Sequence, residues 1–510
     1  MKSIKYSIVL LIVSTVMWSC KQTPEPSGPG FAQIVGGIGL ERGLIEKKPE
    51  HTPGYVYFCP LLSSTTYLIN TDGQVVHTWE SEYGPSGWGY LMDNGDLLRG
   101  GRDPFGKFDG GGQGGYLQRI SWEGEILWEY KYSSEDYMTH HDVAVMPNGN
   151  ILAISWEDIS KEEAISAGKN PDHIPNDGIW PDKIVEIKPL ENNEAEIVWE
   201  WRMWDHMIQN FDPELPNYGN PNDHPELLDI NVGGSPPDTV TVEELDERRK
   251  RGNANTNDTP DNQGSDIYHL NAINYNPELD QIIFSNPNLG EVFVIDHSTT
   301  TEEAAGHSGG RWGKGGDYLY RWGNPQNYGR GDTLDQKLSG QHDVQWIESG
   351  KPGAGNILVF NNNEPNVERG FASVLEIDPP LSDLSYEITD NGPFGPDVTS
   401  WKYMAADTFS FVSPFISGTH RMANGNTFIC QGPKGRFFEV TPKGEIVWEY
   451  MTPYSGDSRM PDGTLPQPVG PLIYATFRAT HITGDHPAVK ERNLEALTPQ
   501  PEIHKAEENN

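Results

Sequence analysis

The repeat that decides the fold is most complete in the stretch His141-Asp142-Val143-Ala144-Val145-Met146-Pro147-Asn148-Gly149-Asn150-Ile151-Leu152. A histidine opens an apolar strand there, and the Asn of an Asn-Gly turn follows seven residues later, which is a strong hairpin signal. The segment His269–Pro277 repeats the spacing, and His342 opens a third copy whose turn is longer. Two weaker copies, Trp88–Leu98 and Thr419–Ile429, keep the Asn-Gly turn without the histidine.

A second kind of hairpin closes on an aromatic strand. Examples are Arg119–Tyr130, Glu186–Trp201 and Glu439–Tyr450. Two hairpins form a four-stranded blade, and repeats of this size that are rich in glycine and aromatic residues are typical of β-propellers. We therefore predict an all-β protein, a six-bladed β-propeller that forms a single domain with long loop insertions.

The two ends of the chain are expected to meet in one blade. The opening strands Tyr55–Phe58 and Thr66–Trp79 would be completed by the late segment Ile473–Ile482. An open sandwich or several separate all-β domains is the alternative. The regular spacing of the turns favours the propeller, and so do 55 glycines and 40 prolines among 510 residues, which suit a chain of strands and turns.

The first 20 residues have the features of a lipoprotein-type signal peptide. Lys2 and Lys5 precede the apolar run Ile8–Met17, which is too short for an ordinary membrane span. The run ends just before Ser19-Cys20, and a small residue followed by cysteine resembles a bacterial lipoprotein processing site. We expect an exported chain that is lipid-anchored at Cys20 in the bacterial cell envelope, in the periplasm or at the outer membrane. A plain secretory signal or a short signal anchor is the alternative.

The expected organisation follows from these features. Residues 1–20 are the signal peptide, 21–50 a tether and N-terminal extension, 51–490 the propeller and 491–510 a polar C-terminal tail. The other two cysteines, Cys59 and Cys430, lie in the first and a late strand, and an oxidising compartment would permit a bond between them. Two separately buried thiols are the other possibility.

The charge of the chain bears on its partners. There are 37 basic and 74 acidic residues, so the formal charge is −37, and the acids are spread along the sequence. Such a surface repels phosphate backbones. Nucleic acid is therefore not an expected partner, and membrane contact is expected only through a lipid at Cys20.

The three register histidines are the candidate catalytic residues. Strands that enter the innermost position of a blade begin beside the axis, so His141, His269 and His342 would face one another. Imidazole titrates close to neutrality and can act as nucleophile, base or acid. Alone, His141 and His342 could each cap a strand together with the Asp that follows. His420 is a further candidate, although aligning the Asn-Gly turns puts Ser417 at the ring position, so His420 could belong to the core.

Cationic and amide side chains are expected to bind the charge of a substrate. Arg369 follows an Asn-rich run that contains Asn361 and Asn362, and Arg421 adjoins His420. A guanidinium group matches an oxyanion and stays charged at any working pH, whereas asparagine adds neutral donors. Pairing with nearby acids is the alternative role for both arginines.

Metal and nucleotide cofactors are not predicted. The sequence has no His-Glu-x-x-His helix, no cysteine pair and no EF-hand loop, although zinc bound by histidines from different blades stays possible. The glycines of Gly110–Gly115 lack the Lys-Ser/Thr of a phosphate loop.

The chain resembles the bacterial arylsulfate sulfotransferase family, especially its exported branch. The resemblance covers most of the mature chain, and its segments are Trp180–Ile187, Trp199–His206, Asn220–Asn231, His269–Asp280, Asp296–Thr301, Arg321–Pro325, Gln341–Asp343 and Ser413–Gly418. It implies a six-bladed propeller that moves a sulfuryl group from a phenolic sulfate ester to a phenol without the nucleotide sulfate donor PAPS. The implied partners are therefore a small aryl sulfate and a phenol.

The resemblance also implies roles for individual residues. His269, in a His-x-Asn segment that ends at Asn271, and His342, in Gln-His-Asp, match family histidines that contact the sulfate. Arg369 takes the part of the family arginine after the Asn-rich turn, but it stands a few residues later than the family pattern. The departure concerns the nucleophile. The family uses a histidine in the late blade, where Ile429–Phe437 has none and His420 is the nearest.

The mechanistic hypothesis is double displacement. His420 or His342 would attack sulfur, while Arg369, His269 and asparagine donors hold the sulfuryl oxygens and His141 helps the phenolate to leave.

Two other classes of function are open. One is a polysaccharide lyase or hydrolase that acts on sulfated or uronate-containing glycans. The other is a non-catalytic binding propeller whose insertions, Glu157–Asp182 and Trp204–Asp266, hold a ligand or partner.

Overall fold

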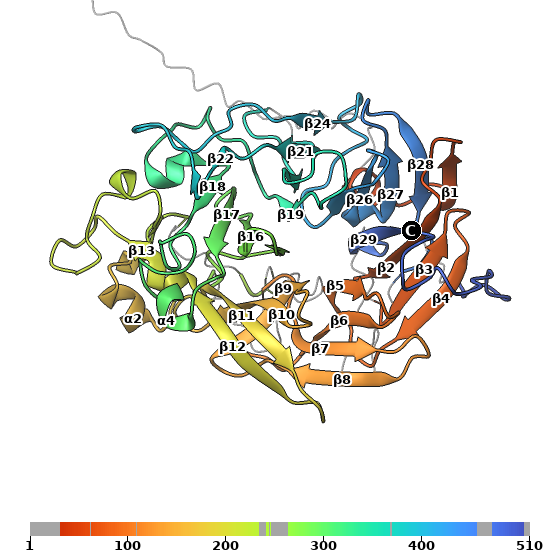
Figure 1. Ribbon diagram of the computed structural model, residues 1–510, viewed down its shortest axis with the longest axis horizontal. Helices are drawn as coiled ribbons and strands as arrows, with labels where there is room; N and C mark the ends of the chain where they lie inside the picture. The colour runs from red at the N-terminus through yellow and green to blue at the C-terminus, as the bar shows by residue number, and fades with distance from the viewer. Residues whose placement is uncertain are drawn as a thin grey trace, which may run out of the picture.

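The chain folds into six four-stranded antiparallel sheets arranged around one axis (Figure 1). The computed structural model describes residues 31–61, 63–108, 110–233, 241–243, 245, 264–367, 370–455 and 472–503. The predicted six-bladed all-β propeller is therefore confirmed. The predicted signal peptide and Cys20 lie outside the described residues. Within the described part, no helix has the length and apolar character needed to span a membrane.

In each blade the first strand lies nearest the axis (Figure 1). Blades 1 to 3 are β29-β2-β3-β4 (Thr476–Thr483, Gly54–Pro60, Thr65–Asn70, Val75–Glu80), β5-β6-β7-β8 (Pro85–Leu91, Leu97–Arg102, Gly115–Ile120, Ile126–Lys131) and β9-β10-β11-β12 (Tyr137–Val145, Ile151–Glu157, Asp182–Pro189, Ala195–Arg202). Blades 4 to 6 are β15-β16-β17-β18 (Ala272–Asn276, Gln281–Asn286, Glu291–Asp296, Tyr320–Trp322), β19-β20-β21-β24 (His342–Trp346, Ile357–Asn361, Ser373–Ile377, Trp401–Tyr403) and β25-β26-β27-β28 (Gly418–Arg421, Thr427–Gln431, Arg436–Val440, Ile446–Met451).

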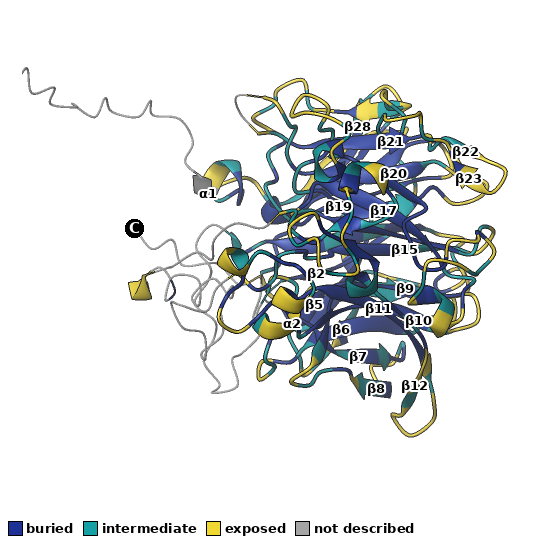
Figure 2. Cartoon of the chain, turned by 90° about the vertical axis from the view of Figure 1, so that its left-hand side faces the viewer, coloured by how far each residue is buried: buried dark blue, intermediate teal, exposed yellow. Residues whose placement is uncertain are grey.

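Shorter elements lie in the connections between these strands. They are the helices α1 (Phe31–Ile34), α2 (Lys161–Ser166) and α4 (Thr301–Ala304), the 3-10 helices η1 (Pro171–His173), η2 (Met203–His206), η3 (Pro221–Asp223), η4 (Pro325–Tyr328) and η5 (Gly432–Lys434), and the short strands β13 (Met207–Ile208), β14 (Leu228–Asp229), β22 (Leu381–Ser382) and β23 (Ser385–Tyr386). Figure 2 shows that the long strands are mostly buried, whereas exposed residues gather in the connecting loops.

Both ends of the chain close the ring. The late strand β29 is the inner strand of blade 1, and His481 pairs with Val56 of β2 in an antiparallel ladder. The strand β1 (Gly43–Lys47), from the predicted N-terminal extension, pairs with β28 and adds a fifth strand to blade 6. Packing also continues past residue 490, because the amide N–H of Leu497 donates to Val75 O on β4.

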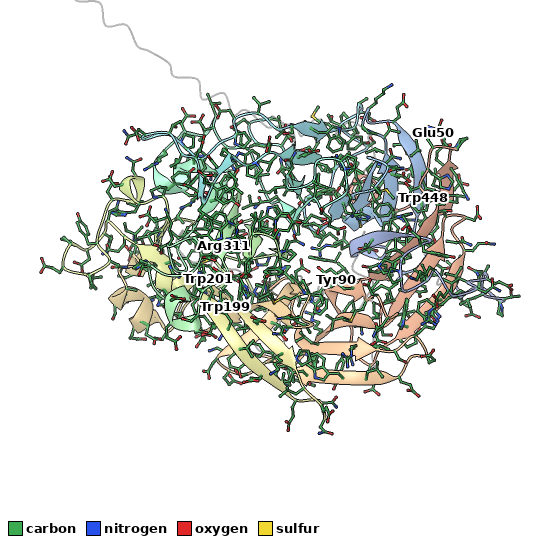
Figure 3. The ribbon with its side chains drawn as sticks, in the orientation of Figure 1. Glu50, Tyr90, Trp199, Trp201, Arg311 and Trp448 are labelled. Carbon is green, nitrogen blue, oxygen red and sulfur yellow. The ribbon has the colours of Figure 1, made fainter. Side chains whose placement is uncertain are left out.

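A tryptophan on the fourth strand of each blade covers the contact with the next blade. Five indole N–H groups donate to the connection between the third and fourth strands of that blade; the pairs are Trp128 with Glu194 O, Trp199 with Thr299 Oγ1, Trp322 with Pro396 O, Trp401 with Pro442 O and Trp448 with Thr71 O. In the sixth contact Trp79 packs edge-on against Trp122, with ring centroids 5.2 Å apart. Figure 3 shows Trp199 on β12 and Trp448 on β28. Five of these six tryptophans are buried and Trp401 is half-buried, and the polar edge of the ring has a partner in all but one contact.

The inner strands of blades 2 to 6 each have a residue in the left-handed conformation, either within the strand or just before it. In four blades this residue stands seven positions before the Asn of the turn; the residues and their φ angles are Gly87 (111°), His141 (52°), His269 (58°) and Ser417 (93°). In blade 5 the residue is Asp343 (53°), directly after His342. The weaker sequence copies thus share the backbone kink, although glycine or serine stands in place of histidine. Register shifts occur at the same point in the ladders of β5, β9 and β19.

An ion cluster joins the inner strands across the axis. Arg478, on β29, donates from both terminal nitrogens to Asp142, at 3.1 and 3.0 Å, and its Nε lies 2.9 Å from Asp343 Oδ1. Tyr90 of blade 2 and the backbone N–H of Ile273 of blade 4 also donate to Asp142.

The same cluster reaches the last blade. The N–H of Thr419, in blade 6, donates to Asp343 at 2.6 Å. Burial raises the pKa of Asp343 to about 6 in spite of Arg478, and the two carboxylates raise the pKa of Arg478 well above its ordinary value. Every blade therefore contributes a group to this cluster.

We predict that Arg478→Met lowers the free energy of unfolding by about 3–5 kcal/mol, because Asp142 and Asp343 would be left buried without a counter-charge. Chemical denaturation followed by tryptophan fluorescence measures the change. The control is Lys47→Met, which removes an exposed ion pair with Asp72 and should cost less than about 1 kcal/mol. Equal, small losses in the two variants would contradict a stabilising role for the cluster.

Candidate active site at the propeller axis

The three register histidines gather beside the axis. The rings of His141 and His269 cross at 78° with their centroids 4.4 Å apart. Phe477 of β29 lies between His141 and His342, and its ring centroid is 6.0 and 6.1 Å from theirs. Side chains from blades 3 and 5 thus pack against one aromatic ring of blade 1, and His269 of blade 4 joins them through its contact with His141.

A fourth histidine, which the sequence analysis missed, belongs to this cluster. His140 stacks on Trp156 at 3.9 Å, and its Nδ1 lies 2.8 Å from Nδ1 of His141. Consecutive side chains of a regular strand point to opposite faces, so this contact requires the left-handed backbone at His141. The Nε2 atom of His140 lies 2.6 Å from Oδ1 of Asp182, which is fully buried. The only signal in the sequence was the adjacent histidine pair itself.

Asp182, His140 and His141 form a hydrogen-bonded chain with two proton arrangements. When Asp182 is ionised, it accepts from Nε2 of His140, and Nδ1 of His140 accepts from Nδ1 of His141. Nε2 of His141 then carries a lone pair. When Asp182 holds a proton, both bonds reverse and Nε2 of His141 carries a hydrogen.

The electrostatic surroundings allow both proton arrangements of Asp182, His140 and His141. Burial raises the pKa of Asp182 well above its ordinary value, and the charge of Asp266 adds to this effect. Burial lowers the pKa of His140 and His141 well below the ordinary value, and the neighbouring His269 lowers both further. Both imidazoles are therefore neutral at working pH, and the carboxyl group can accept a proton more readily than an exposed one.

His269 is the member of the cluster whose pKa is raised. Its Nδ1 makes a short hydrogen bond to Asp266, and its side chain is 18% exposed. Burial alone would lower the pKa of His269, but the charge and the hydrogen bond of Asp266 outweigh this effect and raise it. The N–H group at Nε2 is thus available to a bound anion.

The lone pair on Nε2 of His342 already accepts a hydrogen bond from the protein. Its Nδ1 donates to Gly340 O and to Asn362 Oδ1, both at 2.9 Å, so its Nε2 must accept the N–H of Ile416 at 3.2 Å. Burial lowers the pKa of His342 to about 4. This ring is neutral and held in one tautomer, which does not suit a nucleophile.

A glycine loop approaches the exposed side of the cluster. A Cβ atom added to Gly112 would lie 2.4 Å from the ring of His141, so only glycine fits there. A Cβ on Gly111 would lie 4.0 Å from Nε2 of His141 and equally far from Nε2 of His269. The two Nε2 atoms therefore flank one point beside Gly111. In the sequence this segment attracted notice only because it lacks the residues of a phosphate loop.

Two predicted residues lie elsewhere. His420 packs against Phe428 with centroids 5.1 Å apart, and its Nε2 is buried without a hydrogen-bond partner. Arg421 is paired with Glu376 at 2.6 Å, and its guanidinium group lies over Trp401. The structure therefore gives Arg421 the alternative role of pairing with an acid, because a carboxylate within the fold already neutralises its charge.

The predicted asparagine donors connect blades to one another. Asn271 donates to Gln341 O at 2.8 Å, and Asn362 donates to Ser413 O and Ile416 O. Asn361 donates weakly to Lys337 O and accepts from the N–H of Ser339. Their N–H groups are directed to protein atoms, which corrects the expectation that they face a substrate.

Other predicted residues are placed as follows. Arg369 lies outside the described residues. Cys59 and Cys430 are both free thiols, so the two do not form a disulfide in this structure.

A cavity of about 570 Å³ lies at the rim, where Lys314, Trp312 and Tyr386 contribute to its lining, and it contains none of the axial histidines.

Comparison with known proteins identifies one matching family. The model of the family described as arylsulfotransferase (ASST) matches residues 47–452. Similar solved structures include a protein of unknown function from Bacteroides caccae (12% identity, 78% of this chain and 94% of that chain, TM-score 0.41) and the periplasmic gluconolactonase of Pseudomonas aeruginosa (9% identity, 79% and 97%, TM-score 0.39). No curated protein matches the chain.

The buried His342 predicts a loss of stability in acid. In the unfolded chain His342 takes up a proton at about pH 6.5, whereas in the folded protein it does so at about pH 4. Its contribution is therefore fully present above pH 6.5 and is lost as the pH falls towards 4, by up to roughly 3 kcal/mol.

Denaturant unfolding at about pH 7 and about pH 5 measures this loss. His342→Gln should lose less stability on acidification than the parent protein does, while His51→Gln, at a partly exposed histidine, should behave like the parent. Identical pH dependence in all three proteins would show that His342 is not buried in neutral form.

Proposed function

The chain belongs to the arylsulfotransferase family, and from this premise we propose that its axial histidines move a sulfuryl group from a phenolic sulfate ester to a phenol, without a nucleotide donor. The observation that supports this most is the placing of two imidazoles whose Nε2 atoms flank the same point beside Gly111, with the pKa lowered at His141 and raised at His269. One ring can attack sulfur while the other binds the anion.

In the first half-reaction the lone pair on Nε2 of His141 attacks the sulfur atom. A nitrogen–sulfur bond forms, and the bond between sulfur and the phenolic oxygen breaks. The phenolate leaves with the electron pair and takes the proton from Nε2 of His269, so a neutral phenol departs. This assignment differs from the sequence-based hypothesis, in which His420 or His342 attacks and His141 is the acid. It is favoured because Nε2 of His342 already accepts a hydrogen bond.

The hydrogen-bonded side chains of His141, His140 and Asp182 remove the positive charge that the attack creates on the His141 ring. A sulfuryl group on Nε2 would make the His141 ring cationic while Nδ1 keeps its hydrogen. That proton passes to Nδ1 of His140, and the proton on Nε2 of His140 passes to Asp182. The raised pKa of Asp182 suits it to this role.

The second half-reaction is the reverse with a different phenol. The acceptor hydroxyl gives its proton to His269, and its oxygen attacks the sulfur atom. The nitrogen–sulfur bond breaks, the electron pair returns to Nε2 of His141, and the two protons move back from Asp182 and His140. One anion site thus serves both halves, and Arg369 is retained as a proposed additional donor to the sulfuryl oxygens.

Purified protein mixed with 4-nitrophenyl sulfate and phenol should release nitrophenolate with ping-pong kinetics. We predict that His141→Gln lowers kcat/KM by roughly 10³-fold or more and that His269→Gln lowers it by roughly 10²-fold. His51→Gln is the matched control and should retain activity.

The alternatives give different results. Loss of activity in His420→Gln but not in His141→Gln would move the nucleophile to blade 6. Binding of the sulfate ester by the parent protein without any turnover would favour a non-catalytic propeller.

Asp182→Asn tests the proton chain. The amide would still accept the N–H of Leu270 through its oxygen, but its NH₂ group would donate to Nε2 of His140. His140 must then donate to His141, which places a hydrogen on the attacking nitrogen. We predict a loss in kcat of roughly 10²–10⁴-fold, with little change in KM.

The pH profile separates this role from a structural one. In the parent protein activity should rise with pH as Asp182 ionises and fall as His269 loses its proton. In Asp182→Asn the rising limb should disappear. A folded variant with the parent profile would rule out proton transfer to Asp182.

A further inference from the structure

A second group of titratable side chains lies away from the axis, where blade 3 passes into blade 4. His206 ends η2, His307 follows α4, and Asp317 precedes β18. One possible ligand atom from each residue lies within 4.8 Å of the other two. Figure 1 places α4 at the rim of the propeller, beside β12. None of the three residues takes part in the proposed transfer.

The hydrogen bonds of His206 fix the direction of its ligand atom. Nε2 lies 2.8 Å from Ala304 O, and because a carbonyl oxygen can only accept, Nε2 carries the hydrogen. Nδ1 is directed at Oδ1 of Asp317, 2.8 Å away. Metal-bound histidines usually have this support, in which the distant ring N–H donates to a carbonyl or carboxylate.

The same carboxylate oxygen also faces the second histidine. Nδ1 of His307 lies 2.8 Å from Oδ1 of Asp317. Two imidazole nitrogens and one carboxylate oxygen, from three separate segments, thus converge on one region. An Asp whose only role is to cap a loop does not need two imidazole nitrogens next to the same carboxylate oxygen.

The surroundings hold His206 rigidly. Its ring stacks on Trp201 with an interplanar angle of 4°, and the indole N–H of Trp201 donates to Gly316 O at 2.8 Å. A Cβ on Gly316 would lie 2.5 Å from Nε2 of His206, so glycine is needed at this position. His206 and Asp317 are buried, whereas the side chain of His307 is 62% exposed. An ion could therefore enter from the side of His307.

We propose that His206, His307 and Asp317 form a binding site for a divalent transition metal of the zinc class. Imidazole nitrogens disfavour calcium and magnesium, which prefer oxygen ligands, and three protein ligands leave a fourth tetrahedral position for water. Ligands about 2.0–2.1 Å from zinc lie about 3.3 Å from one another in a tetrahedron. The two nitrogen–oxygen separations need to widen only modestly from 2.8 Å, and the exposed His307 can provide this movement.

The site would fasten two neighbouring blades. His206 comes from the exit of β12 in blade 3, whereas His307 and Asp317 come from the connection between β17 and β18 in blade 4. A metal that binds only the folded chain stabilises it in proportion to the logarithm of the free metal concentration. The role is therefore structural, and it does not depend on the sulfuryl transfer proposed above.

The test uses the protein without a polyhistidine tag, stripped with a chelator. Calorimetric titration with Zn²⁺ should show one equivalent bound, and the melting temperature should rise with added Zn²⁺. His307→Ala should abolish both effects, and because this side chain is exposed the variant should fold. His224→Ala removes another exposed histidine, which is paired with Glu226, and should bind Zn²⁺ like the parent.

X-ray absorption at the zinc edge should report two imidazole ligands in the loaded protein. Zinc binding and the melting temperature are measured without the transfer reaction, so their outcome does not depend on whether that activity exists. His307→Ala should leave the transfer of sulfate from 4-nitrophenyl sulfate unchanged. The proposal is overturned if the parent protein binds no stoichiometric Zn²⁺, or if His307→Ala binds it as tightly as the parent does.

Discussion

The contact between Arg478 and the two carboxylates of Asp142 and Asp343 is the constraint on which the centre of this propeller depends. Removing three charges from water costs several kcal/mol for each ion, so the arrangement is stable only if every charged group finds partners. Asp142 directly follows His141, and Asp343 directly follows His342. The ions that close the ring therefore also fix the backbone from which two of the axial histidines project.

The left-handed residues of the inner strands explain how the axial histidines come together. Non-glycine residues rarely adopt a positive φ, and such conformations persist where the surrounding structure enforces them. At His141 the kink places two consecutive imidazoles in contact, which a regular strand does not allow. In the equivalent positions Gly87 and Ser417 have the same backbone without an imidazole. The repeat thus sets the backbone conformation at this position, whereas the side chain at this position differs from blade to blade.

Much of the architecture could be predicted from the sequence because it depends on local patterns. Asn-Gly turns, alternating apolar strands and the spacing from histidine to turn indicated the hairpins, the number of blades and the three axial histidines. The closing strand from Ile473 to Ile482 was also predictable, because β-propellers commonly complete one blade with strands from both ends. The structure places the hairpins, the closing strand and the three rings as these patterns indicated.

The partners of buried polar groups could not be predicted, because tertiary packing selects them. Asp182 is 42 positions from His140 in the chain, and nothing local indicates that the two meet. The sequence allows Arg421 to bind an anion, but burial beside Glu376 gives it a partner within the fold. Asn271 and Asn362 were expected to face a substrate, yet the carbonyl groups of the next blade take their donors. A buried donor needs an acceptor, and the nearest one is decided by the packing of the blades.

In the proposed transfer, His141 carries the sulfuryl group between donor and acceptor. The most direct measurement is mass spectrometry of peptides from protein mixed with 4-nitrophenyl sulfate in the absence of phenol and quenched at high pH, where a sulfuryl–imidazole bond survives best. We expect the added mass of one sulfuryl group on the peptide that contains His141, and its disappearance when phenol is added before the quench. An unmodified His141 peptide in protein that releases nitrophenolate, or the added mass on a different histidine, would contradict it.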